Sequence, residues 1–254
     1  MSNIRLVLLL LLLIFSLNIF GQSSYYEVDN IINKVYNLDF ENIPEEIANI
    51  GKTEPQIACY LRIDYLWWRM ISNHSISTES EFCEYLNSFK ENKSGIEEEF
   101  ERLTYFMYQI RYDNFKNEGF SRYLTALNFH FFIGKMDNKK AVKLNSLENS
   151  ILQLTIEFDK YMKYKYLNSF GFYSKRNIEQ CQLCLRNIEK MTNVNSNTFA
   201  TIKNYLLGKI YLEIEKDYLT AYEKFGNLSA AFPGNKIFVG IKKDCKAHIS
   251  KYPN

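Results

Sequence analysis

Apolar residues near the C-terminal end of the chain recur at steps of three and four, the spacing of one face of an α-helix. The first stripe consists of Phe199, Ile202, Leu206, Ile210 and Ile214. The second consists of Tyr218, Ala221, Tyr222, Phe225, Leu228 and Phe232, and the third of Ile237, Ile241, Cys245, His248 or Ile249, and Tyr252. Pro233 and Gly234 separate the last two stripes, because proline cannot continue a helix and glycine accepts a left-handed backbone. The pattern predicts three amphipathic helices joined by short turns, with Ser196 or Asn197 as the first N-cap.

Helical stripes of the same kind run through the rest of the chain. They include Ile96, Phe100, Leu103, Met107 and Ile110, then Ile151, Leu154, Phe158 and Tyr161, then Ile178, Cys181, Leu185 and Ile188. Breaks fall at residues 51–55, 73–78, 92–95, 117–119, 137–140, 171–175 and 192–197. Residues 127–131 alternate like a strand, but a lone strand would have no partner, so a helix is favoured. We expect an all-α chain of about ten to twelve helices.

Residues 196–235 resemble a tetratricopeptide repeat, a helix-turn-helix unit of about 34 residues with Leu-Gly, Tyr, Ala, Phe and Pro at set positions. The matching residues here are Leu207-Gly208, Tyr211, Ala221, Phe225 and Pro233. The resemblance implies a right-handed solenoid of helical hairpins that binds another protein. It also implies that Gly208 permits close helix approach, that Tyr211 and Phe225 fill the gap, that Ala221 lies at the helix crossing and that Pro233 ends the unit.

The match to this repeat has three departures. The interval from Gly208 to Ala221 is one residue longer than usual, Glu215-Lys216 replaces a glycine in the turn, and Asn204 stands where a large aromatic is expected. Residues 39–73 resemble, in degenerate form, the second helix of one unit, closing near Pro55, and the aromatic-rich first helix of the next.

The first 21 residues have the composition of a cleaved export signal. A short start containing Arg5 precedes the apolar run 6–15, and Gly21 offers a small residue for cleavage before Gln22. The alternative is an uncleaved anchor, but a spanning helix needs roughly 17–25 mostly apolar residues, and Ser16 and Asn18 interrupt this one. We therefore expect a periplasmic or extracellular protein that is not membrane-embedded after cleavage.

The remaining residues, 22–254, are expected to form a single helical domain. Loss of Arg5 with the signal takes the basic residues from 31 to 30, against 29 acidic residues. Such a balance offers no global field to attract nucleic acid. The chain has 19 Tyr, 19 Phe and 2 Trp but only 10 Gly and 4 Pro, and this shortage of turn residues favours helices over turn-rich β architectures.

The five cysteines, Cys59, Cys83, Cys181, Cys184 and Cys245, are an odd number and cannot all pair within one molecule. Most are interpreted as small buried apolar residues, with one bridge plus free thiols as the alternative. Cys181 and Cys184 form a C-x-x-C pair, but redox pairs open a helix after a strand and zinc sites need two further ligands. Neither context is evident here, although a local disulfide stays open.

No catalytic motif is recognisable in the chain. His74, His130 and His248 stand far apart, and nucleophile-elbow, P-loop and dinucleotide-binding patterns are absent from the sequence. Acidic runs such as residues 97–101 are typical of a solvated helix face, although a pair of carboxylates for sugar hydrolysis stays an alternative. We expect no enzyme activity, no cofactor and no metal.

Trp67 and Trp68 are the candidate ligand or partner face, because aromatic side chains anchor peptides and stack on sugars. Adjacent helical residues point about 100° apart, so at least one of the two is expected in the core. The sequence thus predicts an exported, non-catalytic helical-repeat scaffold for protein–protein interaction. The alternative is a small-molecule or glycan-binding module with an aromatic-lined groove.

Overall fold

The structure, a computed structural model, describes residues 26–91, 98–117, 119–137, 146–169, 174–193 and 196–251. Over these residues the chain is all-helical and contains no strand, which confirms the expected fold class. The described part holds 11 α-helices, within the expected ten to twelve. The predicted signal, residues 1–21, lies outside the described residues.

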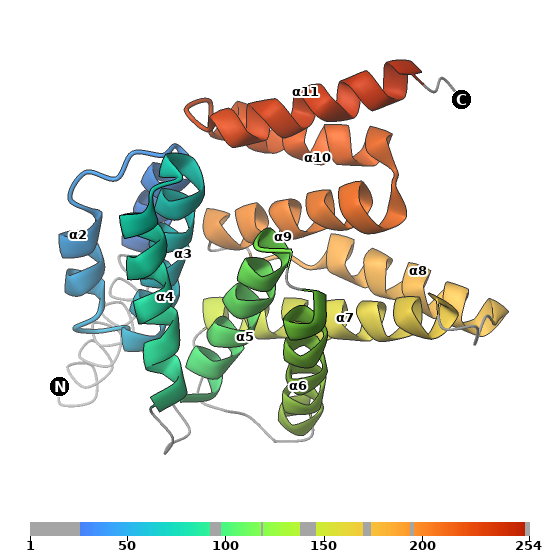
Figure 1. Cartoon of the computed structure of the whole chain (residues 1–254), viewed down its shortest axis with the longest axis horizontal. Helices are drawn as coiled ribbons and strands as arrows, with labels where there is room; N and C mark the ends of the chain where they lie inside the picture. The colour runs from blue at the N-terminus through green and yellow to red at the C-terminus, as the bar shows by residue number, and fades with distance from the viewer. Residues whose placement is uncertain are drawn as a thin grey trace, which may run out of the picture.

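The helices of the N-terminal half stand side by side (Figure 1). They are the helix over residues 26–36, α2 (Ile43–Ile50), α3 (Pro55–Asn73), α4 (Ile76–Glu91), α5 (Glu98–Phe115) and α6 (Gly119–Asp137). Those of the C-terminal half run roughly across them and stack in chain order (Figure 1). They are α7 (Ser146–Ser169), α8 (Lys175–Lys190), α9 (Asn197–Lys209), the π-helix η1 (Ile210–Glu215), α10 (Tyr218–Ala231) and α11 (Lys236–Lys251).

Side-chain caps fix several of the helix starts. Ser174 accepts a hydrogen bond from the Asn177 amide before α8, and Asp217 accepts one from Thr220 before α10. Ser196 accepts one from the Phe199 amide, so it is the N-cap of α9 that the sequence predicts. Each bond satisfies a backbone donor that has no partner within its helix.

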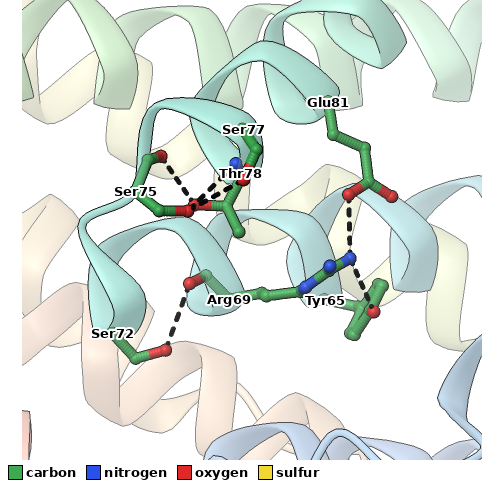
Figure 2. A network of polar contacts seen from close by, with 7 residues as sticks. All are labelled: Tyr65, Arg69, Ser72, Ser75, Ser77, Thr78 and Glu81. Atoms are coloured by element: carbon green, nitrogen blue, oxygen red, sulfur yellow. Dashed lines mark hydrogen bonds and ion pairs between the residues drawn. The ribbon is translucent and has the colours of Figure 1, made fainter.

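The corner between α3 and α4 is held by short polar side chains (Figure 2). The left-handed backbone of His74, with φ of 50°, ends α3. Ser75 then accepts a hydrogen bond of 3.3 Å from the Thr78 amide in the first turn of α4. Arg69 of α3 donates to the Tyr65 hydroxyl at 3.1 Å and to Glu81 of α4 at 2.8 Å. These contacts fix the angle at which α4 returns along α3.

The helix over residues 26–36 ties the beginning of the chain to its end. The carboxylate of Asp29 accepts hydrogen bonds from the backbone amides of Asn197 and Thr198, at 3.0 and 2.9 Å. The buried Asn235 side chain, between α10 and α11, donates to the Tyr36 carbonyl at 2.8 Å. A solenoid stacks each repeat only on its neighbours, so these contacts are additional to a linear stack, and the solenoid arrangement stays a prediction.

Aromatic rings fill the core where the two halves meet. The Trp68 ring of α3 lies 4.9 Å from Tyr36 and 5.2 Å from Phe238 of α11, between ring centroids. Tyr205 of α9 lies 5.7 Å from the same indole. Phe238 is fully buried, whereas the sequence pattern placed Ile237 on the inner face of the last helix. Ile237 is partly buried, Ile241 packs against the core and Cys245 is fully buried, so the predicted stripe faces inward and the sequence pattern missed only Phe238.

Helices α9 and α10 pack closely in the unit that resembles a tetratricopeptide repeat. A Cβ on Gly208 would lie 2.9 Å from the Phe225 ring, so glycine is needed for this approach, as the sequence predicts. Ala221 and Phe225 are both fully buried. Pro233 follows the end of α10, and Gly234 next to it does not adopt a left-handed backbone. Glycine is needed there because a Cβ would lie 2.6 Å from the Asn37 carbonyl oxygen.

The π-helix η1 lies in the interval that is one residue longer than the repeat pattern. A π-helix bonds residue i to i+5 and so takes up an extra residue without ending the helix. Tyr211, in η1, is partly buried and donates from its hydroxyl to Glu189 of α8 at 3.0 Å, so it reaches the preceding helix. Lys216 has φ of 58° at the position where the pattern has glycine.

Candidate functional site

Trp67 and Trp68, the candidate binding face, both lie in the core. Trp68 has no exposed surface and Trp67 has 5%. The Trp67 ring lies 5.7 Å from Phe82 of α4 and 6.4 Å from Tyr108 of α5. Helices pack against α3 on opposite sides, so the two indoles point in different directions and are both buried. Neither ring is available to a ligand or partner in this structure.

A buried carboxylate, Asp64, lies on α3 next to these rings. The Tyr108 hydroxyl donates a hydrogen bond to its Oδ1, and Nη1 of Arg111 lies 3.9 Å from the same oxygen. The Arg111 guanidinium stacks on two aromatic rings, 4.7 Å from the Tyr108 centroid and 5.3 Å from that of Tyr205. Asp64 has no exposed surface, and the Arg111 side chain has 20%.

Burial sets the electrostatics of this cluster. It raises the pKa of Asp64 to about 6, and the charge of Arg111 and the Tyr108 hydrogen bond oppose the rise. A perturbed carboxyl in a cleft would be a catalytic candidate, but Asp64 cannot be reached from solvent. The cluster instead joins α3, α5 and α9, which makes it a structural feature.

The thiols are not arranged for redox or nucleophilic chemistry. All five cysteines are free in the structure, and Cys181, Cys184 and Cys245 are buried, as the packing interpretation expects. Burial raises the pKa of Cys184 to about 11 and also raises the pKa of Cys181, so both are protonated at neutral pH and unreactive. Within the described residues, no three His, Cys, Asp or Glu side chains are grouped as a metal site would require.

The histidines have separate surroundings. His130 of α6 lies 2.8 Å, from Nδ1 to Oδ2, from the buried Asp159 of α7. His248 of α11 stacks on Tyr218 with 4.3 Å between ring centroids, and His74 ends α3. Among the described residues no serine or cysteine side chain hydrogen bonds to any of these rings, so no nucleophile–base pair is formed there.

α6 carries an apolar stripe that is exposed, and packing in the core therefore does not explain it. Leu124, Leu127 and Phe131 are 43%, 40% and 61% exposed. Their spacing of i, i+3 and i+7 puts them in one row along the helix. Phe129, Phe132 and Ile133 are buried on the other face, so α6 is apolar on both sides. We call the exposed row the α6 stripe.

Space around the stripe is open at one end, and basic residues lie on α5 and α7, the helices that contact α6. A Cβ on Gly134, one turn beyond Phe131, would meet no atom within 4 Å. Arg102 of α5 lies with its guanidinium carbon 5.1 Å from the Phe132 centroid. On α7, burial raises the pKa of Asp159. The exposed Lys163 lies close enough to oppose part of that rise. Arg102 thus contacts the packed side of α6, and Lys163 lies beside the carboxylate of Asp159.

Comparisons with known proteins give no relative from which a function could be inferred. No protein-family model, curated protein or solved structure matches the chain. Across the described residues, every helix is too short or too polar to cross a membrane.

Sequence reasoning recognised Leu124, Leu127 and Phe131 as helical but did not single them out as a binding surface. The available signal was the second apolar face at Phe129, Phe132 and Ile133. A helix that is apolar all round is either enclosed or covered by a partner, and the number of packed neighbours decides between these. That number is a property of the fold, so the stripe could be located only in the structure.

Proposed function

We propose that the chain is an exported, non-catalytic helical protein that binds another protein, and that the α6 stripe is part of its binding surface. The observation that carries the proposal is the row of exposed Leu124, Leu127 and Phe131. Single exposed apolar residues are normal on soluble proteins, whereas contiguous patches mark interaction sites. Water contact with this row has a free-energy cost that a partner would remove on binding.

The chemistry of the described residues is consistent with a binding role. The C-x-x-C thiols are buried and protonated, and the buried carboxyl of Asp64 is inaccessible. The alternative, a groove for a glycan or small molecule lined by tryptophan, has no support from Trp67 or Trp68, because both rings are packed in the core. Export remains a proposal based on residues 1–21, and an intact-mass measurement that places the mature N-terminus at Gln22 would support it.

Affinity capture with three forms of the protein tests the binding role. The wild type, a Leu127→Asp/Phe131→Asp variant and a Leu219→Asp/Val239→Asp control would each be exposed to an envelope fraction. The control changes two exposed apolar residues of α10 and α11. Captured proteins would be quantified by mass spectrometry, after circular dichroism shows that all three forms are folded.

We expect one or more proteins to be captured by the wild type and the control but lost from the α6 variant. Capture of the same set by all three forms would contradict a role for the stripe in binding. Loss from both variants would show that capture follows general surface hydrophobicity, which would also contradict it.

A further inference from the structure

Buried polar side chains gather around Asp64, where α3, α5 and α9 meet. Tyr60, Asp64 and Trp68 follow one another at i, i+4 and i+8 on α3, so they project from the same side of that helix. All three are buried. From α5, Arg111 and Tyr108 face the carboxylate of Asp64. We call these five side chains the Asp64 cluster.

Several polar atoms of the Asp64 cluster are buried and have no hydrogen-bond partner within the described residues. They are the Tyr60 hydroxyl oxygen, Asp64 Oδ2, Trp68 Nε1 and Arg111 Nη1. Oδ1 of the carboxylate, by contrast, accepts a hydrogen bond from Tyr108. In folded proteins the large majority of buried polar side-chain atoms bond to protein or to ordered water. Unpaired atoms on neighbouring side chains therefore indicate a bound molecule that bridges them.

The spacing around the carboxylate is that of groups separated by a small molecule. Arg111 Nη1 lies 3.9 Å from Asp64 Oδ1, whereas a direct N–H···O bond spans about 2.7–3.2 Å. Burial raises the pKa of Asp64, and Arg111 and Trp68 lie close enough to oppose part of that rise. The indole N–H of Trp68 is thus near the carboxylate without bonding to it. Polar groups separated by more than about 3.5 Å are commonly bridged by water.

The hydrogen-bonding chemistry of these atoms selects the bound molecule. Trp68 Nε1 and Arg111 Nη1 only donate, an ionised Asp64 only accepts, and the Tyr60 hydroxyl does both. A metal cation cannot be ligated by N–H donors and would be repelled by the Arg111 charge. An anion would be repelled by the Asp64 carboxylate. Water has two donors and two acceptors and bonds to buried groups that lack partners, so it matches the set.

We propose that one ordered water molecule is bound between Asp64 Oδ2, Trp68 Nε1 and Arg111 Nη1. It accepts hydrogen bonds from the two N–H groups, and it donates to Oδ2 and to the Tyr60 oxygen. The water restores part of the solvation that burial removes from the carboxylate. It also joins α3 to α5 at the place where Arg111 stacks on Tyr205 of α9. The Arg111 side chain, 20% exposed, connects the site with solvent.

A crystal structure of the mature protein, at a resolution that shows ordered water, tests the proposal directly. We expect a water oxygen about 2.7–3.2 Å from Asp64 Oδ2 and from at least one of the two N–H donors. A direct hydrogen bond from Trp68 or Arg111 to Oδ2, with no water between them, would overturn the proposal. A bound cation, recognised by contacts of about 2.0–2.6 Å, would overturn it as well.

Nuclear magnetic resonance tests the site in solution through the indole proton of Trp68. The chain has 2 Trp, so a protein with isotope-labelled tryptophan gives one indole signal for each, and Trp67→Phe assigns them. Trp68 has no exposed surface, so surface water does not reach this proton. We expect a cross peak between the proton and water, with the sign that a long-lived bound molecule gives.

Tyrosine hydroxyls near Asp64 exchange with solvent and can relay such a signal. Tyr36→Phe, Tyr60→Phe and Tyr108→Phe each remove one of these hydroxyls. The cross peak should persist in each variant, because the water keeps the carboxylate and both N–H donors as partners. Its loss from a folded variant would assign the signal to that hydroxyl and overturn the bound water, and so would its absence from the wild type.

Discussion

Helices α3 and α6 are each 19 residues long and rich in aromatic side chains, yet they have different surroundings. α3 contacts α2, α4 and α5, and its Trp68 ring packs against residues from both ends of the chain. α6 packs mainly on α5 and leaves Leu124, Leu127 and Phe131 exposed. Similar composition therefore leads to an enclosed helix in one place and a half-covered one in the other.

The difference shows that the burial of an apolar side chain depends on how many other helices pack against its own helix. α3 even encloses a carboxylate, Asp64, because Arg111 and the Tyr108 hydroxyl compensate part of its desolvation. α6 has apolar residues on two faces, and its contacting helices, α5 and α7, leave Leu124, Leu127 and Phe131 exposed. An aromatic-rich helix is therefore a core helix or a binding surface according to its packing.

The largest effect is expected for Trp68→Ala on α3. Removing this fully buried indole would leave a cavity beside Tyr36, Tyr205 and Phe238. Such a substitution costs roughly 3–5 kcal/mol. Chemical denaturation of the variant measures the loss, with Leu219→Ala, an exposed leucine of α10, as the matched control. A loss no larger than that of the control would show that α3 is not enclosed.

The buried carboxyl of α3 should make stability depend on pH. The pKa of Asp64 is about 6 in the folded protein, above its unfolded value of about 3.9. The folded state therefore binds the proton more tightly. The stability that this group contributes is present below about pH 4 and is lost as the pH rises through about 6.

Asp64→Asn, which cannot titrate, isolates that contribution. Between about pH 4 and 7, the wild type should lose on the order of 3 kcal/mol relative to the variant. Denaturant unfolding of both proteins across this pH range is the measurement. A constant difference between the two, or one of opposite sign, would refute the buried, raised-pKa account of Asp64.

A smaller effect on stability is expected for a substitution in the helix over residues 26–36, which packs against α3 through Tyr36 and Trp68. Asp29→Ala removes the carboxylate that accepts bonds from the α9 amides of Asn197 and Thr198, at a cost of about 1–2 kcal/mol. Hydrogen exchange should then increase in α3 more than in α6, because Trp68 of α3 packs on Tyr36 of the helix over residues 26–36 and no described ring contact or hydrogen bond joins α6 to it. Glu27→Ala, on the same helix and exposed, is the control. Equal increases in α3 and α6 would contradict the proposed link.

Much of this fold could be predicted from local sequence signals. Gly51 and Pro55 mark the break between α2 and α3, and Pro233 marks the end of α10, because backbone chemistry acts over a few residues. The close contact of Gly208 with the neighbouring helix agrees with what the resemblance to a tetratricopeptide repeat implies. The resemblance to tetratricopeptide repeats itself stays a prediction.

The remaining features depend on residues far apart in the chain. Asp29 caps α9 from 168 residues away, and no local pattern indicates such a bond. The candidate site at Trp67 and Trp68 was misplaced for the same reason, because distant helices cover both rings. The α6 stripe is exposed because no described helix covers it, and periodicity gives no information on that.

Two adjacent phenylalanines of α6 test the central claim most directly. Phe132 is 9% exposed and packs 5.4 Å from Phe106, whereas Phe131 is 61% exposed. By denaturant unfolding, Phe132→Ala should cost roughly 3–5 kcal/mol, and Phe131→Ala should change stability by less than about 0.5 kcal/mol. That result would establish that Phe131 lies on an uncovered face, available to a partner. A loss for Phe131→Ala as large as that for Phe132→Ala would show that the stripe belongs to the core and would contradict the account.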